Sequence, residues 1–197
     1  YAAHGFLVHQ FLSPIANRRT DKWGGNAENR RRFAIEVARS IRANWPEEYP
    51  LVFRLSATDW LEGGVEIEDT IMTAQALKAE GVDMIDCSTG GIAGRERPRR
   101  MTIEQGFQVP FAAQVREEAD VSTMAVGLLW DAKICEEIIA KGEADMIALA
   151  RELLDDPNWP LHAAATLDAD HDHNMWPEES GWWLMKRERL MSKLGLR

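Results

Sequence analysis

Short apolar runs alternate with amphipathic stretches along most of this chain. Runs rich in Val, Ile, Leu and Met predict buried strands at 51–57, 82–88, 122–126 and 145–149. Between and before these runs, apolar positions recur at helical spacing and predict helices at 29–43, 67–80, 109–119 and 131–141. Regular alternation of strand and helix is typical of a parallel sheet whose strands are joined by helical crossovers.

Two architectures contain such a sheet, an open doubly wound sheet and a (β/α)8 barrel. The G-x-G-x-x-G turn that often follows the first strand of an open sheet is absent from the sequence. The segments Gly81–Asp86 (GVDMID) and Gly142–Ile147 (GEADMI) are similar, as expected of repeated units. A whole barrel takes roughly 250 residues, so four units within residues 1–167 would form about half of one. Residues 168–197 are polar and then Trp-rich, and they predict a C-terminal extension ending in a basic amphipathic helix at 182–194.

Composition restricts the classes of function. With 45% hydrophobic and 28% charged residues, the chain has the composition of an ordinary globular protein. Its net charge of −9 argues against a nucleic-acid partner, because phosphate binding needs a basic surface, and the short basic run at 95–100 is expected to be solvated. No apolar run approaches the roughly 20 residues of a membrane span. The isolated Cys87 and Cys135 predict buried free thiols in a reducing compartment, the cytoplasm.

Polar and small residues gather where the predicted strands end, the edge at which a barrel carries its chemistry. These residues are Tyr1–His4, Arg54, Ser56–Asp59, Ser88–Gly91, Gly127 and Ala150–Arg151. They include hydrogen-bond donors but no cluster of metal ligands. Backbone amides at Gly127 and Ala150, beside Arg151, form a candidate phosphate cradle. The His and Asp residues at 168–173 are interpreted as an exposed acidic linker, because no distant third metal ligand is evident.

Several motifs occur in the same order as in one known family. They are Ala2–Pro14 (AAHGFLVHQFLSP), Asn17–Asp21 (NRRTD), Gly24–Gly25, Glu28–Arg30 (ENR), Phe53–Asp59 (FRLSATD), Gly81–Ser88 (GVDMIDCS), Ala125–Gly127 (AVG) and Ala150–Leu154 (ARELL) before Asp156–Pro157. Through them the chain resembles the old yellow enzyme family of FMN-dependent ene-reductases, particularly its thermophilic-like bacterial branch. The resemblance spans about residues 1–166, and the shared order of so many motifs makes it specific.

The resemblance implies a fold and a reaction. The fold is α/β, a (β/α)8 TIM barrel with FMN at its mouth, of which this chain supplies the last four β/α units and the extension. NADH or NADPH reduces the flavin, which then transfers hydride to the β-carbon of an α,β-unsaturated carbonyl compound. The implied partner is this small-molecule substrate, with no nucleic acid and no membrane, and the full-length protein is expected to be a homo-oligomer.

The resemblance also assigns roles to residues. His4 matches the second of two side chains that hydrogen-bond the substrate carbonyl and stabilise its developing negative charge. Arg54 matches the arginine that faces the N1/O2 edge of the flavin. The implied substrate-binding residues are Tyr1, Ala2, Ala3 and His4, and the implied cofactor-binding residues are Arg54, Gly127, Ala150 and Arg151.

Two positions depart from the family pattern. Tyr1 stands where the first donor is usually a histidine, and Phe6 replaces the usual proton-donating tyrosine. A phenol can donate both a hydrogen bond and a proton. We therefore interpret Tyr1 as a catalytic residue that takes over part of both roles.

Two other functions stay open. The segment Ser56–Gly64 (SATDWLEGG) also looks like the reductase-type domain of some aryl-CoA monooxygenases, which suggests a reductase of unsaturated or aryl CoA esters. The second alternative is a truncated, inactive half-barrel fragment. The first four strands of the family's barrel, which supply much of its FMN site, are not in this chain.

Overall fold

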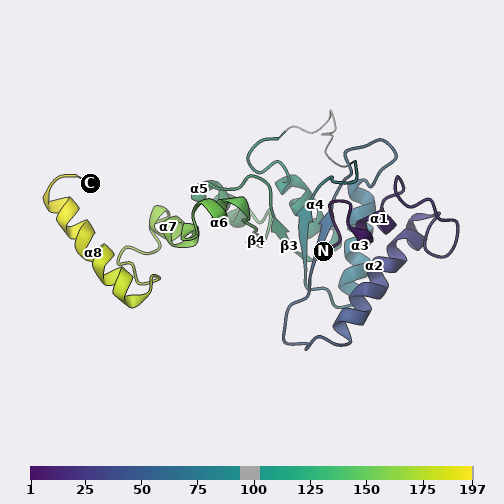
Figure 1. Cartoon of the computed structure of the whole chain (residues 1–197), viewed down its shortest axis with the longest axis horizontal. Helices are drawn as coiled ribbons and strands as arrows, with labels where there is room; N and C mark the ends of the chain where they lie inside the picture. The colour runs from purple at the N-terminus through teal and green to yellow at the C-terminus, as the bar shows by residue number, and fades with distance from the viewer. Residues whose placement is uncertain (94–102, 197) are drawn as a thin grey trace. The chain divides into compact units, whose positions relative to one another are not determined.

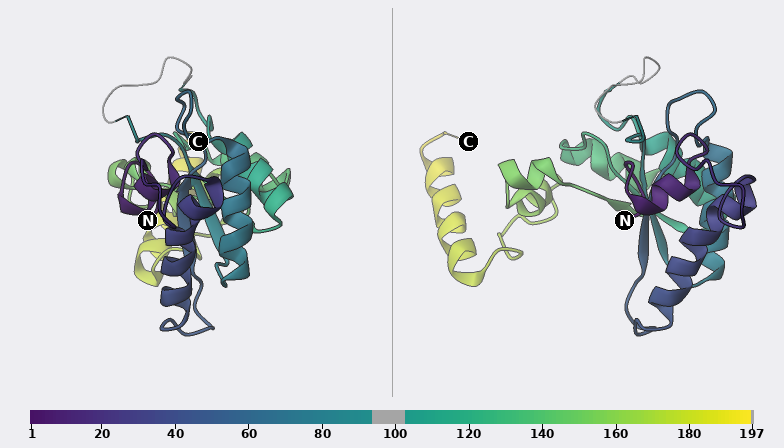
Figure 2. Two further views of the ribbon diagram at one scale, coloured as in Figure 1. Left: turned by 90° about the vertical axis from the view of Figure 1, so that its right-hand side faces the viewer. Right: turned by 45° about the vertical axis from the view of Figure 1, so that its right-hand side comes forward.

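The chain forms two compact units. A computed structural model describes residues 1–93 and 103–196 (Figures 1 and 2), and the basic run at 95–100 lies outside these ranges. The first unit contains Tyr1–Leu129 and Ile138–Ala148, and the second contains Trp130–Glu137 and Leu149–Arg197. Within the described ranges, no helix is both long and apolar enough to cross a membrane.

The first unit is built on a parallel sheet, whose described strands are β1 (Val52–Ser56), β2 (Met84–Ser88), β3 (Ser122–Ala125) and β4 (Met146–Ile147) (Figure 1). The strands lie in chain order, and each pairs in parallel with the next. This confirms the predicted parallel sheet with helical crossovers. In the register of β1 and β2, Arg54 is opposite Asp86 and Ser56 is opposite Ser88. These four side chains therefore share one face of the sheet.

The other face of the sheet carries the core. Phe53 and Leu55 of β1 and Ile85 and Cys87 of β2 are almost fully buried. Helix α4 (Val109–Ala119) packs on β2 and β3 and contacts α3 (Ile67–Ala79), which in turn contacts α2 (Ala27–Arg42). Both cysteines are free and buried, as predicted.

The face that carries Arg54 is less covered within this unit. Side chains alternate along a strand, so Val52 shares this face with Arg54 in β1. Val52 is 41% exposed and Met146 of β4 is 48% exposed. The first unit thus leaves apolar strand residues open to solvent on one face of its sheet.

The ends of the helices follow signals in the sequence. Asn26 precedes α2, and its Oδ1 accepts a hydrogen bond from the Asn29 amide at 2.8 Å. Helix α3 has Glu68 and Asp69 in its first turn, where negative side chains interact favourably with the positive end of the helix dipole. Just after α3 comes Gly81, with φ 84°. The predicted helices at 29–43 and 67–80 are therefore confirmed to within two residues.

The polar segment before α2, where the sequence pattern predicts no helix, contains a short helix, α1 (Leu7–Leu12). Helix α1 contacts α2, and the rings of Phe11 and Phe33 stack with their centroids 4.3 Å apart. A helix of this length is marginal without tertiary packing and too short to show a clear period. The sequence pattern therefore could not reveal it.

The second unit contains three further helices, α6 (Arg151–Asp155), α7 (Trp159–Thr166) and α8 (Glu178–Lys193), and helix α5 (Ala132–Ala140) crosses the division between the units. The Trp159 indole N–H donates to the Trp130 carbonyl at 2.8 Å. Helix α8 confirms the predicted C-terminal helix. The predicted division into residues 1–167 and 168–197 stays a prediction.

The expectation of an exposed linker at 168–173 is wrong for two of its residues. Asp170 and His173 are both buried. The Asp170 carboxylate accepts hydrogen bonds from the backbone amides of Asn174 at 2.7 Å and Met175 at 3.2 Å. Asp170 thus organises a local turn, a use of aspartate that composition alone does not distinguish from a solvated linker.

Candidate active site

The segment that carries His4 is attached to the end of β1. Ala2 forms a parallel bridge with Leu55, and the Ala2 amide donates to the Arg54 carbonyl at 2.9 Å. The His4 amide donates to Ser56 Oγ at 3.0 Å. This segment therefore runs parallel to β1 and places His4 at the carboxyl end of the sheet.

The turn at His4 fits closely against the loop after β2. His4 has φ 53°, a left-handed conformation that is uncommon for a residue with a side chain. A Cβ atom at Gly91 would lie 2.3 Å from His4 Cα, so position 91 has no room for any side chain. Ser56 Oγ also donates to the Gly90 carbonyl at 2.8 Å. The strand-end loops hold the His4 backbone from two sides.

The His4 ring lies between two hydroxyl groups. Nδ1 contacts the Tyr1 hydroxyl, and Nε2 contacts Ser88 Oγ. Burial, followed by the positive charge of Arg54, lowers the pKa of His4 from 6.5 to about 4. His4 is therefore neutral at physiological pH, and a neutral imidazole has one donor and one acceptor nitrogen.

The lowered pKa of His4 gives a direct prediction. In an NMR titration, the ring resonances of His4 should show a midpoint near pH 4, because burial and the nearby Arg54 disfavour the imidazolium. The unfolded state binds the proton more readily, so this group should weaken folding as the pH falls from 6.5 toward 4. A His4 midpoint near 6.5 would contradict the described environment.

Tyr1 and Phe6 lie beside His4. The Tyr1 and Phe6 rings meet edge to face with centroids 5.0 Å apart, and the Arg54 guanidinium lies 5.4 Å from the centre of the Tyr1 ring. Tyr1 and Phe6 are each 59% exposed. The structure therefore brings together the three positions singled out by the family pattern, and among them the phenol of Tyr1 contacts His4.

Arg54 forms an ion pair across the sheet with Asp86. Arg54 Nε lies 3.1 Å from Asp86 Oδ2. The contact is not a well-directed hydrogen bond, and neither Arg54 Nε nor Asp86 Oδ1 has a hydrogen-bond partner among the described residues. Burial raises the pKa of Asp86, and Arg54 opposes the rise. The pair keeps unsatisfied hydrogen-bonding capacity in the region of His4.

The candidate phosphate residues belong to different units. Gly127 follows β3 in the first unit, and a Cβ atom there would lie 2.8 Å from Gln108 Nε2. Glycine at 127 therefore permits packing of Gln108. Ala150 and Arg151 belong to the second unit, where Arg151 begins α6. The proposed cradle of Gly127, Ala150 and Arg151 stays a prediction.

Sequence reasoning missed the side-chain partners of two histidines. His9 Nδ1 accepts from the nearby Gly5 amide at 2.9 Å, and His9 Nε2 contacts the distant Asp59 at 2.8 Å. The contact of His4 with Ser88 joins segments 84 positions apart. The clusters at 56–59 and 88–91 had indicated the region, but sequence spacing could not pair individual atoms.

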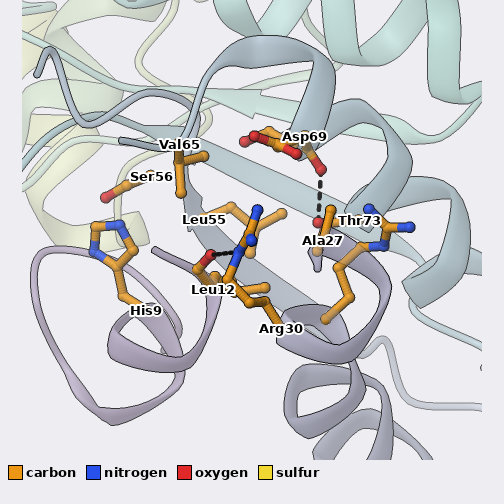
Figure 3. Close-up of a pocket in the computed structure, with 11 residues that line it drawn as sticks. His9, Leu12, Ala27, Arg30, Leu55, Ser56, Val65, Asp69 and Thr73 are labelled. Carbon is orange, nitrogen blue, oxygen red and sulfur yellow. Dashed lines mark hydrogen bonds between the residues drawn. The ribbon is translucent and has the colours of Figure 1, made fainter. Parts of the chain in front are cut away.

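A small, partly open cavity lies beside His9 (Figure 3). Leu12, Leu55 and Val65 supply apolar walls, and Arg30 donates to the Leu12 carbonyl at its edge. The cavity measures about 20 Å³, which is room for about one water molecule. It is therefore too small to be the substrate site.

Comparison with known proteins identifies the family. The model of the NADH:flavin oxidoreductase / NADH oxidase family matches residues 1–170. The chain belongs to this family. The resemblance to old yellow enzymes is thereby confirmed.

Curated members of this family from several bacteria are similar to the chain. The NADPH dehydrogenase of Bacillus subtilis (strain 168) is 43% identical over 170 residues, which are 86% of this chain and 48% of the relative. The NADPH dehydrogenase of Listeria innocua serovar 6a is 44% identical over 167 residues, with 85% and 48% covered. The chain spans about half the length of the curated relatives it matches.

Solved structures show the same likeness. A 2-naphthoyl-CoA reductase in complex with 2-naphthoyl-CoA is 30% identical with a TM-score of 0.75, covering 86% of this chain and 26% of that one. Morphinone reductase in complex with tetrahydroNAD is 26% identical with a TM-score of 0.64, covering 85% and 42%. An old yellow enzyme homologue from Zymomonas mobilis, 21% identical with a TM-score of 0.64 over 81% and 43%, supports the fold alone.

One residue of this flavin oxidoreductase family member, Arg54, has the chemistry that suits a flavin. Arg54 Nε, a cationic donor, lacks a hydrogen-bond partner among the described residues. An unsatisfied guanidinium suits the electron-rich N1/O2 edge of an isoalloxazine ring. The contact of Arg54 with the flavin and the phosphate contacts all stay predictions.

Proposed function

We propose that this chain supplies the last four β/α units of a (β/α)8 barrel, and that the whole protein is an FMN-dependent oxidoreductase. It uses NADH or NADPH to reduce the activated C=C bond of α,β-unsaturated carbonyl compounds. Family membership, four parallel strands in chain order and relatives of about twice the length support this proposal. The open face of the sheet, with Val52 and Met146 exposed, suits the interior of a barrel that further strands would close.

The observation that carries the proposal is the neutral His4 ring in contact with the hydroxyl of Tyr1, whose ring lies against Arg54. Hydride addition to the β-carbon moves negative charge onto the substrate carbonyl oxygen. In the proposed site, His4 and Tyr1 donate hydrogen bonds to this oxygen, and donors fixed before the reaction stabilise the developing charge. A neutral His4 can serve because its proton stays on the ring as a hydrogen-bond donor.

FMN, when bound, supplies the hydride that it takes from the reduced nicotinamide. Arg54 would hold the N1/O2 edge of the ring, and its positive charge would stabilise an electron-rich pyrimidine. Gly127, Ala150 and Arg151 would hold the phosphate. The product also needs a proton on the α-carbon, and we assign this proton to the Tyr1 hydroxyl because Phe6 carries none.

Tyr1→Phe tests this assignment. We expect kcat for cyclohexenone reduction to fall about 100-fold, because general acid catalysis typically contributes 100-fold or more. Adding Phe6→Tyr to this variant places a phenol at the position the family usually uses and should recover part of the activity. Stopped-flow measurement of flavin reoxidation by the enone isolates the step. Unchanged turnover in Tyr1→Phe would show that Tyr1 has no such role.

A reductase of unsaturated CoA esters is the second candidate. It is favoured by the likeness to 2-naphthoyl-CoA reductase, which has a TM-score of 0.75. Steady-state assays of the FMN-loaded protein with NADPH should compare cyclohexenone with crotonyl-CoA. A higher kcat/KM for the enone supports the main proposal, and a higher value for the thioester supports the alternative. If neither substrate is turned over, the result would favour the alternative that the chain is a truncated, inactive half-barrel fragment.

A homo-oligomeric, cytoplasmic protein is part of the same proposal. The two buried free thiols, Cys87 and Cys135, are consistent with a reducing compartment. Light scattering of the full-length protein would determine its oligomeric state.

A further inference from the structure

A buried cluster of three polar side chains, His9, Ser13 and Asp59, has no role in the proposed mechanism but contacts the residue that follows His4. His9 and Asp59 are each 1% exposed, and Ser13 is fully buried. His9 and Ser13 come from α1 and the residue after it, whereas Asp59 follows β1. Burial of a carboxylate is costly unless it is paired and hydrogen-bonded, so the geometry of this cluster is informative.

The hydrogen bonds determine which nitrogen of His9 carries the proton. The Gly5 amide donates to His9 Nδ1 at 2.9 Å, so Nδ1 must be an unprotonated acceptor. His9 Nε2 then carries the proton and donates it to Asp59 Oδ1 at 2.8 Å. A protonated Nδ1 would present a second donor to the Gly5 amide and would break the contact.

Asp59 is itself fixed by further donors. Its Oδ2 accepts from Ser13 Oγ at 2.7 Å and from the Val65 amide at 2.9 Å. Burial alone would raise the pKa of Asp59, but the hydrogen bonds from His9, Val65 and Ser13 outweigh it and hold the pKa below its usual range. An ionised Asp59 selects the His9 form with the proton on Nε2.

This chain of contacts ends one residue from the candidate donor. Gly5 follows His4 directly, and its carbonyl accepts from Gln10 Nε2 at 2.7 Å while its amide is held by His9. The backbone on both sides of the His4 turn is thus fixed, by Ser56 before it and by His9 after it. These two hydrogen bonds fix the backbone from which the His4 side chain projects, and so they set the direction of its ring.

We propose that Asp59 and His9 form a positioning pair that orients His4 toward the substrate carbonyl. The proposal rests on the proposed function, in which His4 is the hydrogen-bond donor. Asp59 fixes the proton of His9 on Nε2, the free Nδ1 holds the Gly5 amide, and the fixed amide holds the His4 turn. A small displacement of a catalytic group, of the order of 1 Å, can cost about 100-fold in rate.

Two substitutions of His9 test its two hydrogen bonds separately, the one to Gly5 and the one to Asp59. In His9→Asn the shorter side chain places its amide oxygen near the former Nδ1, where it can still accept from Gly5. In His9→Gln the longer side chain places its amide near the former Nε2, where it can still donate to Asp59 but leaves Gly5 without its acceptor. Both variants should be made in the FMN-loaded protein.

The positioning role predicts that His9→Gln loses more activity than His9→Asn. We expect His9→Gln to lower kcat/KM for cyclohexenone by about 10- to 100-fold and to speed hydrogen exchange of the Gly5 amide. His9→Asn should keep the Gly5 amide protected and retain more activity, although it leaves the Asp59 carboxylate without its histidine. Ser13→Ala is the matched control, because it removes a donor to Asp59 and leaves the His9 side chain unchanged. It should lower Tm with little change in kcat/KM.

A purely structural role predicts the opposite order. Activity would then follow Tm, and His9→Asn would be at least as damaging as His9→Gln. That result, or a protected Gly5 amide in His9→Gln, would overturn the proposal. Should neither variant fold, the wild-type protein decides, because long-range ¹H–¹⁵N NMR that showed the proton of His9 on Nδ1 would also overturn it. Failure of the proposed function is recognised separately, by wild-type protein that does not reduce the enone.

Discussion

His4→Ala is expected to lower kcat for cyclohexenone by about 100- to 1,000-fold, the usual cost of losing one preorganised donor to a developing oxyanion. The substitution removes the ring that lies between the Tyr1 and Ser88 hydroxyls. It leaves the His4 amide, and with it the contact to Ser56 Oγ, in place. The loss should therefore come from the chemistry of the ring rather than from the path of the backbone.

The measurement is the rate of flavin reoxidation by the enone, compared with the rate of flavin reduction by NADPH. Reoxidation should slow strongly, and reduction should change much less. His162→Ala is a matched control, because His162 lies in the second unit and pairs with Asp156 at 2.6 Å. Equal reoxidation rates in the His4 and His162 variants would remove His4 from the substrate site.

The second large effect concerns the cofactor. Residues 1–197 expressed alone are expected to purify with little or no FMN. The chain spans about half the length of its relatives, and one face of its sheet leaves Val52 and Met146 exposed. A flavin pocket buries most of its ligand, and the proposed half of a barrel mouth would not provide that enclosure. The absorbance ratio of flavin to protein after gel filtration measures the outcome.

A chimera supplies the control. Joining the N-terminal half of the Bacillus subtilis NADPH dehydrogenase to residues 1–197 should restore flavin binding, since the two proteins are 43% identical over the shared region. An Arg54→Gln version of the chimera should bind FMN more weakly, because it loses the cationic donor. Stoichiometric flavin on residues 1–197 alone would contradict the expectation.

The fold of the first unit could be predicted because its periodicity is strong. The predicted strand at 51–57 contains β1 (Val52–Ser56), and the predicted helix at 109–119 coincides with α4. Strand β4 is shorter than predicted, with Met146–Ile147 against 145–149. Helices α1 and α7 were not predicted, since short helices owe their stability to packing more than to local pattern.

The candidate site could be predicted in its members but not in its contacts. The motifs around His4 and Arg54 indicated both residues as members of the site, although Arg54 lies in the middle of β1 rather than at its end. The partnership of His4 with Ser88, and the role of Gly91, depend on how separate loops fold back on each other. Such contacts arise from tertiary geometry, which no local spacing encodes.

The close approach of Gly91 to His4 has a consequence for how the substrate range of such a site can diverge. Because no side chain fits at position 91, mutation there would displace the donor turn itself. Tyr1 and Phe6 have exposed side chains and can change without moving that turn. The two departures from the family pattern fall at these permissive positions. New specificity can therefore arise by exchanging the exposed rings while selection keeps glycine at position 91.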